Sequence, residues 1–149
     1  MDKQMEAFIL GIMNNANDLT LATVRDDGYP QATTVSYANQ GLTIYIGTGM
    51  DSQKAKNIRR CDKVSLTINT DYGNDWNKIK GLSMGAAAQV LSDPAEIKRA
   101  QACIASKFPE WKDIPGLELA ETAFLKIIPK VISVLNYEKG FGYTELVKL

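Results

Sequence analysis

The sequence predicts a mainly β protein with flanking helices, in which six or seven antiparallel strands form a small barrel. Short runs rich in Thr, Val, Ile and Tyr recur from Leu19 onward, and turn residues separate them. Helical periodicity is confined to a few short segments. Short connections favour antiparallel neighbours, and closure into a barrel removes the edges that an open sheet would expose. For a chain of 149 residues we expect one domain, over residues 1–149.

The first third of the chain predicts one helix followed by a three-stranded meander. Apolar residues spaced by three and four form one stripe of an amphipathic helix: Met5, Phe8, Ile9, Ile12 and Met13. The stretch "LTLATVRDDGYPQATTVSYANQGLTIYIG" then contains three strand-like runs, which "DDG" and "NQG" separate. We therefore expect an antiparallel meander in which each of these strands pairs with the next.

The rest of the chain alternates predicted strands with two helices. Residues Ser52–Arg60 fit a short helix, and "KVSLTINT" and "KIKGLSMGAAAQVL" fit strands. Asp93 and Glu96 fit the capped start of the next helix. The run "AFLKIIPKVISVLNY" predicts two strands broken at Pro129, and "YTELVKL" adds a last strand.

Composition narrows the classes of function. Seventeen basic and seventeen acidic side chains cancel, so no global field attracts nucleic acid or an anionic membrane. Cys61 and Cys103 form neither a disulfide framework nor a zinc motif. The first residues are too polar for a signal peptide or a membrane span. We expect a cytoplasmic protein with no metal site.

The chain contains no histidine. This absence excludes Ser-His-Asp and Cys-His nucleophile pairs, histidine metal sites and histidine general bases. If the protein is an enzyme, we expect a bound cofactor to supply the reactivity.

The loop "GTGMDSQKAKNI", between a predicted strand and a short basic helix, has two interpretations. Thr48 and Ser52 offer hydroxyls, the first N–H groups of the helix point outward, and Lys54 adds a positive charge, which together favour an anion. Alternatively, Asp51 or Ser52 simply caps the helix, and the lysines form a solvated face. The loop matches neither the nucleoside-triphosphate loop nor the dinucleotide fingerprint, so its residues leave both interpretations open.

Three stretches in their order resemble the pyridoxamine 5'-phosphate oxidase-like flavoproteins, which have the FMN-binding split barrel. They are "LATVRDDGYPQATTVSY", "GLTIYIGTGMDSQKAKNIRRCDKVSLTI" and "GAAAQVLSDPAE". The resemblance covers almost the whole chain, and its most specific part is the middle stretch, which matches a strand, an S-x-K helix and the next strand. It is closer to the short general-stress-protein-like members than to the oxidase that makes the vitamin B6 coenzyme. The resemblance implies a single FMN-binding split-barrel domain over residues 1–149.

The resemblance also implies which residues would bind the cofactor. The FMN phosphate would contact Ser52, Gln53 and Lys54, with Asn57 one turn further. The edge of the isoalloxazine ring would follow Gln31, Ala32, Thr33, Thr34 and Val35. The ribityl and phosphate side would lie along Tyr45, Ile46, Gly47 and Thr48. Family members are usually homodimers with flavin sites between subunits, so Lys80, Gly81 or Trp111 would reach the partner's flavin.

The implied function is that of an FMN-dependent oxidoreductase that passes electrons from a reduced nicotinamide donor to a small acceptor. No side chain is predicted to be catalytic. Coenzyme B6 synthesis is not expected, because Gln31 and Gln53 stand where the oxidase typically has arginines, and its C-terminal Arg-x-His motif needs a histidine.

Three alternatives remain open at the level of the sequence. The protein could be a non-catalytic flavin-binding sensor or storage protein of stress physiology, or a deazaflavin-dependent reductase. It could also be a barrel that binds single-stranded nucleic acid, but zero net charge and scattered aromatic residues disfavour that function.

Overall fold

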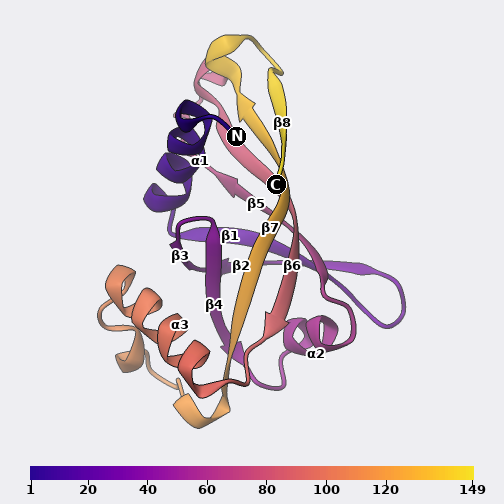
Figure 1. The fold of residues 1–149 in the computed structure, drawn as a ribbon, viewed down its shortest axis with the longest axis vertical. Helices are drawn as coiled ribbons and strands as arrows, with labels where there is room; N and C mark the ends of the chain where they lie inside the picture. Colours follow the sequence, from indigo (N-terminus) through magenta and orange to yellow (C-terminus); the bar gives the residue numbers. More distant parts are fainter.

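A computed structural model describes residues 1–149 and confirms a mainly β fold with flanking helices (Figure 1). The strands are β1 (Asp18–Val24), β2 (Pro30–Ser36), β3 (Ala38–Gln40), β4 (Thr43–Gly49), β5 (Lys63–Asn69), β6 (Lys80–Val90), β7 (Thr122–Asn136) and β8 (Thr144–Lys148). The α-helices are α1 (Lys3–Asn15), α2 (Gln53–Arg60) and α3 (Pro94–Lys107). All strand pairs are antiparallel.

One residue, Tyr37, joins two strands that lie at opposite ends of the sheet. The order β2-β1-β5-β6-β7-β4-β3 places β2 at one edge and β3 at the other, and β8 is added to β7. Since β2 ends at Ser36 and β3 begins at Ala38, the sheet curls until its two edges meet at Tyr37. β2 pairs only with β1, so the barrel is split along its other side. The predicted antiparallel split barrel is therefore confirmed.

The predicted three-stranded meander is wrong at its second connection. β1 and β2 form the expected hairpin, in which Thr23 lies opposite Gln31. β4, however, pairs with β3 and with the distant β7, where Ile46 lies opposite Leu125. Alternation along a strand indicates which residues face inward, whereas pairing between strands far apart in sequence leaves no local signal.

Pro129 does not divide the last long strand, contrary to the sequence prediction. β7 is continuous, and Pro129 lies opposite Ala86 at a shift of register between Gly85 and Ala86. Proline has no N–H group to give to the ladder, but at such an irregularity the ladder is already interrupted. A Cβ atom on Gly85 would lie 3.0 Å from Val131 Cγ1, so this glycine permits β7 to approach closely.

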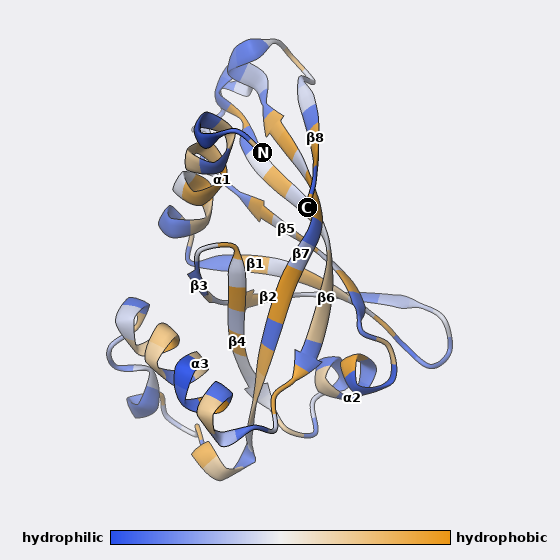
Figure 2. Cartoon of the chain, in the orientation of Figure 1, coloured by the Kyte–Doolittle hydropathy of each residue, from blue (hydrophilic) through white to orange (hydrophobic).

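The core has two parts, one inside the barrel and one beside it. Inside, β5 turns Val64, Leu66 and Ile68 inward, and α1 adds Ile9 and Met13. The second cluster lies between β4, β7 and α3 and contains Tyr45, Ala100, Ile104, Trp111 and Phe124. Figure 2 shows the corresponding alternation of apolar and polar residues along the strands and α1. The second cluster forms the floor of the cavity described below.

The helices lie toward the two ends of the molecule. β6 and β7 run along most of its length, with α1 and β8 toward one end and α2 and α3 toward the other (Figure 1). α2 contacts β1 and β6, and α3 contacts β3, β4 and β7. None of the helices combines the length and hydropathy that a bilayer span needs. α2 therefore lies against β1, the first strand of the β1–β2 hairpin.

Candidate functional site

Ser52 immediately precedes α2, and its hydroxyl proton makes no hydrogen bond within the protein. Its Oγ accepts from the backbone N–H of Ala55 at 3.2 Å, which makes Ser52 the N-cap of the helix. The same oxygen accepts from the Thr48 hydroxyl at 3.1 Å. A serine hydroxyl has two acceptor positions and one proton, and the Ser52 proton meets no acceptor within the protein. The capped-helix and anion-site interpretations of this loop are therefore compatible.

A chain of side-chain hydrogen bonds connects the first turn of α2, at Gln53, to the buried Asn57 and on to Thr23 of β1. Gln53 Nε2 donates to Asn57 Oδ1 at 2.8 Å, and Asn57 Nδ2 donates to Thr23 Oγ1 at 2.9 Å. Asn57 and Thr23 are each 2% exposed. Because Asn57 is buried and each end of its amide bonds to a protein group, it orients Gln53. Its predicted contact with a phosphate stays a prediction, and the structure indicates a positioning role.

Gln31 lies beside this chain, opposite Thr23 in the β1–β2 hairpin. Its Oε1 atom is buried and has no hydrogen-bond partner. Its Nε2 atom donates to no protein group and is not among the buried unsatisfied atoms, so solvent reaches it. Buried polar atoms are nearly always satisfied in native proteins. An orphaned acceptor and a free donor on one side chain therefore mark Gln31 as a candidate ligand contact.

Lys54, in the first turn of α2, has no acidic partner. The ion pairs of the structure join Arg25 to Asp27, Lys80 to Glu138 and Lys126 to Glu96. Two other cations of α2 bind carbonyl oxygens: Arg59 donates to Met50 O at 2.9 Å, and Arg60 donates to Val24 O at 2.6 Å. Lys54 is half-buried at the second position of α2. A negative group near the helix start would therefore meet an uncompensated ammonium and the positive end of the helix dipole.

A cavity of about 890 Å³ adjoins this loop. Its walls are the ends of β2 and β4, the last turn of α3, and residues 108–121. Thr48 belongs both to the cavity lining and, through its bond to Ser52, to the start of α2. The volume is within the range of cavities that hold cofactors and drug-sized ligands. The arrangement suits an elongated ligand with an anionic end and an apolar body.

Trp111 forms part of the apolar wall of the cavity. Its side chain is 6% exposed and packs edge-on against Phe124, with ring centroids 5.8 Å apart and an interplanar angle of 86°. Edge-to-face pairs of this kind fix the orientation of both rings. Tyr45 belongs to the same buried cluster. Trp111 is therefore held in place as a rigid surface on which a planar ligand could pack.

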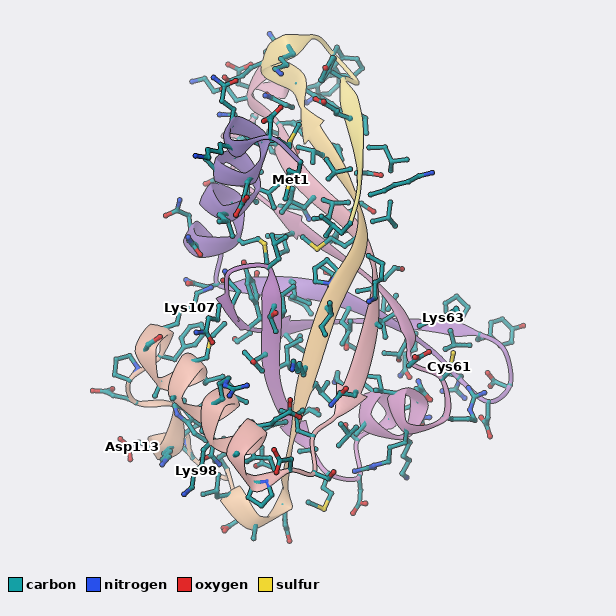
Figure 3. The ribbon with its side chains drawn as sticks, in the orientation of Figure 1. Met1, Cys61, Lys63, Lys98, Lys107 and Asp113 are labelled. Atoms are coloured by element: carbon teal, nitrogen blue, oxygen red, sulfur yellow. The ribbon has the colours of Figure 1, made fainter.

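Lys107 and Tyr37 form the other end of the cavity. Lys107 Nζ donates to Ala16 O and lies 4.0 Å from the centre of the Tyr37 ring. Tyr37 donates its hydroxyl to Met13 O. Burial lowers the pKa of Lys107 and raises the pKa of Tyr37. Figure 3 shows Lys107 at the end of α3 that faces α1. Both side chains bind carbonyls at the C-terminal end of α1, so their first role is structural.

The remaining predicted site residues occupy three different settings. On β2, the side chains of Ala32 and Thr34 are exposed and those of Thr33 and Val35 are half-buried. On β4, Tyr45 and Ile46 are buried, whereas Gly47 lines the cavity with Thr48. Lys80 and Gly81 begin β6 and pair with Asn136 and Leu135 near the end of β7, at the other end of the barrel from α2. These predicted roles stay predictions.

Comparison with known proteins places the chain in a family. A family model described as pyridoxamine 5'-phosphate oxidase matches residues 1–135. The chain belongs to the pyridoxamine 5'-phosphate oxidase family. General stress protein 26 of Bacillus subtilis (strain 168) is 25% identical over 131 residues, which are 86% of each chain. The family resemblance found in the sequence is thereby confirmed.

Solved structures support the same fold. A putative pyridoxamine 5'-phosphate oxidase from Listeria innocua is 26% identical, with a TM-score of 0.70 over 89% of this chain and 98% of its own. A heme binding protein from Mycobacterium smegmatis has a TM-score of 0.82 at 15% identity. That match covers 99% of this chain but only 59% of the other protein, and at this identity it shows the fold alone.

For this member of the pyridoxamine 5'-phosphate oxidase family, sequence reasoning missed three residues at the site. Thr23 resembles any inward-facing strand residue, and only its bond to Asn57 distinguishes it. Tyr37 lies in a strand-like run where its pattern is that of ordinary cross-strand packing, and Lys107 lies in no motif, yet both line the cavity. No local pattern relates Lys107 to the cavity, because its partners lie on α1. A lysine in the last turn of a helix is usually solvated.

Proposed function

We propose that this protein is an FMN-binding flavoprotein that works as an oxidoreductase. The observation that carries the proposal is the hydroxyl proton of Ser52, which has no acceptor within the protein and lies at a helix start where Lys54 has no acidic partner. Thr48 connects this anion site to the 890 Å³ cavity. A phosphate at one end and a flat apolar ring at the other match this pair of features.

The proposed reaction takes its electrons from a reduced nicotinamide donor and gives them to a small acceptor. A bound flavin supplies the hydride chemistry. The residues of this chain bind and orient: Ser52 and Lys54 hold the phosphate, Gln31 offers an amide donor, and Trp111 limits the access of water to the ring. Trp111 is well suited to that role because Phe124 fixes it.

We also propose a homodimer with the cofactor between its subunits. β2 pairs only on one side, so its outer edge is available to a second chain. Lys80 and Gly81 lie at the end of the barrel away from α2, so their predicted contact with a flavin would require the flavin of a partner. Size-exclusion chromatography with light scattering tests this arrangement, and a monomer with full FMN affinity contradicts it.

The decisive experiment is a titration of the ligand-free protein with FMN, FAD and riboflavin. We expect submicromolar FMN binding and at least tenfold weaker riboflavin binding, because riboflavin lacks the phosphate that Ser52 and Lys54 would contact. Reduction by nicotinamide donors under anaerobic conditions then separates an oxidoreductase from a flavin-binding sensor or storage protein. A deazaflavin in the same titration tests the deazaflavin-dependent reductase. If no flavin binds, the proposed function is wrong.

Heme is the second candidate ligand, since a structural neighbour with a TM-score of 0.82 is named as a heme binding protein. The chain has no histidine to serve as the axial ligand. Tyr37 is the tyrosine of the cavity lining, but its hydroxyl is bonded to Met13 O. Titration with hemin therefore should give no ligated-heme spectrum. A sharp Soret band with one equivalent of hemin would favour heme over FMN.

A further inference from the structure

We propose that a second cavity, between the last turn of α2, the end of β6 and α3, binds a small organic acid with a carboxylate on an apolar body. Its volume is about 480 Å³, which is within the range of ligand cavities. It shares only Thr122 and Phe124 with the 890 Å³ cavity. The inference goes beyond the proposed flavin function, because neither Ser52 nor Lys54 lines this second cavity.

The walls of the second cavity are mostly apolar. Leu91 follows the end of β6, and its N–H donates to Phe124 O of β7 at 2.8 Å, so these two residues form one side together with Val90. Both Leu91 and Phe124 are buried in the cluster beside the barrel. Ile97 of α3 and Leu119 add further apolar surface. A molecule that fills this space should therefore have a largely apolar body.

Arg59 is the one charged residue that lines the second cavity. Its Nη1 atom donates to Met50 O at 2.9 Å, and Met50 lines the cavity as well, so the guanidinium lies at the cavity wall. This bond to a carbonyl leaves the positive charge in place. A guanidinium carries five N–H donors in a planar fork and can bind a carboxylate through two parallel hydrogen bonds. The donors that Met50 does not use therefore favour a carboxylate.

No carboxylate of the protein pairs with this guanidinium. Glu96 precedes a lining residue of α3, but it pairs with Lys126 at 3.1 Å. Glu121 lines the 890 Å³ cavity instead. Asp51 and Asp93 are exposed and line neither cavity. A ligand carboxylate would thus meet a cation that has no acidic competitor among the lining residues.

Two neutral polar residues, Ser92 and Gln101, also line the second cavity. Gln101 is half-buried on α3, and neither side chain has an orphaned buried atom, so both remain accessible to water. A hydroxyl and an amide can each donate to a lone pair of a carboxylate. The second cavity therefore combines one charged anchor with two neutral donors on an apolar wall.

The test uses the protein as purified, with methyl groups labelled for NMR, and titrates it with benzoate, benzamide and acetate. Benzamide lacks the charge, and acetate lacks most of the apolar body. We expect benzoate to bind with a dissociation constant of about 1 mM or tighter, and the other two at least roughly tenfold more weakly. Nuclear Overhauser effects from the benzoate ring to the methyl groups of Leu91, Ile97 and Ala123 should locate it in the second cavity.

Two neighbouring arginines provide a matched pair of variants. Arg59→Met should weaken benzoate binding roughly tenfold or more and leave benzamide unchanged. Arg60→Met removes the same charge from the same turn of α2, and Arg60 likewise donates to a backbone carbonyl, that of Val24, at 2.6 Å. Since Arg60 does not line the second cavity, its variant should keep the wild-type affinity. Arg59→Lys should recover part of the affinity, because it keeps the charge without the fork.

Three outcomes would overturn the inference. The first is no binding of benzoate at concentrations up to about 10 mM. The second is equal weakening in Arg59→Met and Arg60→Met, which would indicate attraction to the general charge of α2. The third is contact of benzoate only with methyl groups outside the second cavity. None of these results bears on the flavin function, which the separate titration with FMN tests.

Discussion

Asn57 and Thr23 are the two polar residues that are fully buried in this protein, and they bond to each other. Asn57 Nδ2 donates to Thr23 Oγ1 at 2.9 Å, across the junction of α2 and β1. The bond joins residues 34 positions apart, and it fixes the helix whose first turn carries Ser52 and Lys54. The anion site therefore depends on a contact that no ligand touches.

Removing one partner of this bond should destabilise the protein. Thr23→Val leaves the Asn57 amide buried without its acceptor, and we expect a loss of about 1–3 kcal/mol in the free energy of unfolding. Urea denaturation measures this loss. Thr34→Val removes an exposed hydroxyl contact with Thr20 and should cost less than about 0.5 kcal/mol. Equal losses in both variants would show that the buried bond contributes no more than a surface contact.

Truncation of the phosphate contacts should weaken FMN binding. Ser52→Ala combined with Lys54→Ala removes a hydroxyl donor and the unpaired ammonium group of the first helical turn, and we expect a loss of about 2–4 kcal/mol in binding free energy. Lys56→Ala removes an exposed lysine of the same helix and should change binding by less than about 0.5 kcal/mol.

Ser52 also caps α2, so its two roles must be separated. Ser52→Gly should cost only roughly a few tenths of a kcal/mol of helix stability, whereas Ser52→Ala should cost about 1 kcal/mol. Both variants remove the hydroxyl donor. Similar losses of FMN affinity in the two variants would support phosphate contact, and a loss only in Ser52→Ala would indicate an effect through helix stability.

Trp111 should report the occupation of the cavity. The protein has two tryptophans, so Trp76→Phe leaves the buried Trp111 as the only one. We expect FMN to quench most of its fluorescence, because quenching by a flavin falls steeply with distance. The reciprocal variant, Trp111→Phe, retains Trp76, which is 63% exposed and lies outside the cavity. Weaker quenching of Trp111 than of Trp76 would place the flavin elsewhere.

Tyr37 should make the protein less stable at high pH. Burial raises its pKa in the folded state above the value of about 10 in an unfolded chain. The unfolded state therefore releases this proton first, so the stabilisation is complete below pH 10 and is lost as the pH rises further. The lowered pKa of Lys107 acts in the opposite direction, since its burial penalty is relieved when it deprotonates.

Comparison of Tyr37→Phe with the wild type isolates the tyrosine. The variant loses the bond to Met13 O, so we expect it to be about 1 kcal/mol less stable at pH 7. Between pH 9 and 11 its stability should fall less steeply than that of the wild type. Tyr29→Phe changes a tyrosine that is 73% exposed and should retain the wild-type slope. Identical slopes for Tyr37→Phe and the wild type would contradict the assigned pKa direction.

The elements of the fold were largely predictable, and their pairing was not. Period-two alternation identifies β5, in which Val64, Leu66 and Ile68 face inward. The pairing of β4 with β7 joins residues about eighty positions apart. No pattern within either strand indicates such a partner. Asp93 illustrates a second limit: the sequence fits a capped helix, but its side chain makes no cap bond, and Glu96 instead pairs with Lys126 at 3.1 Å.

The loop of the candidate site was predictable because its chemistry is local. Ser52 and Lys54 lie within three positions of each other, and the position of a cap residue follows from the helix that it begins. The supporting contacts come from elsewhere: Thr23 from β1, Trp111 from the segment after α3, and Lys107 from the end of α3. Only the tertiary structure brings these residues to one place.

The single-residue connection at Tyr37 also limits how the barrel can open. Ser36 and Ala38 are separated by two peptide units, which span at most about 7 Å. The two edge strands thus share a pivot at this point, and any widening of the split must be a rotation of one edge about it. The aperture is then a wedge, with its apex at Tyr37 and its opening away from it. A ligand that exploits such motion would enter through the open side and leave the apex unchanged.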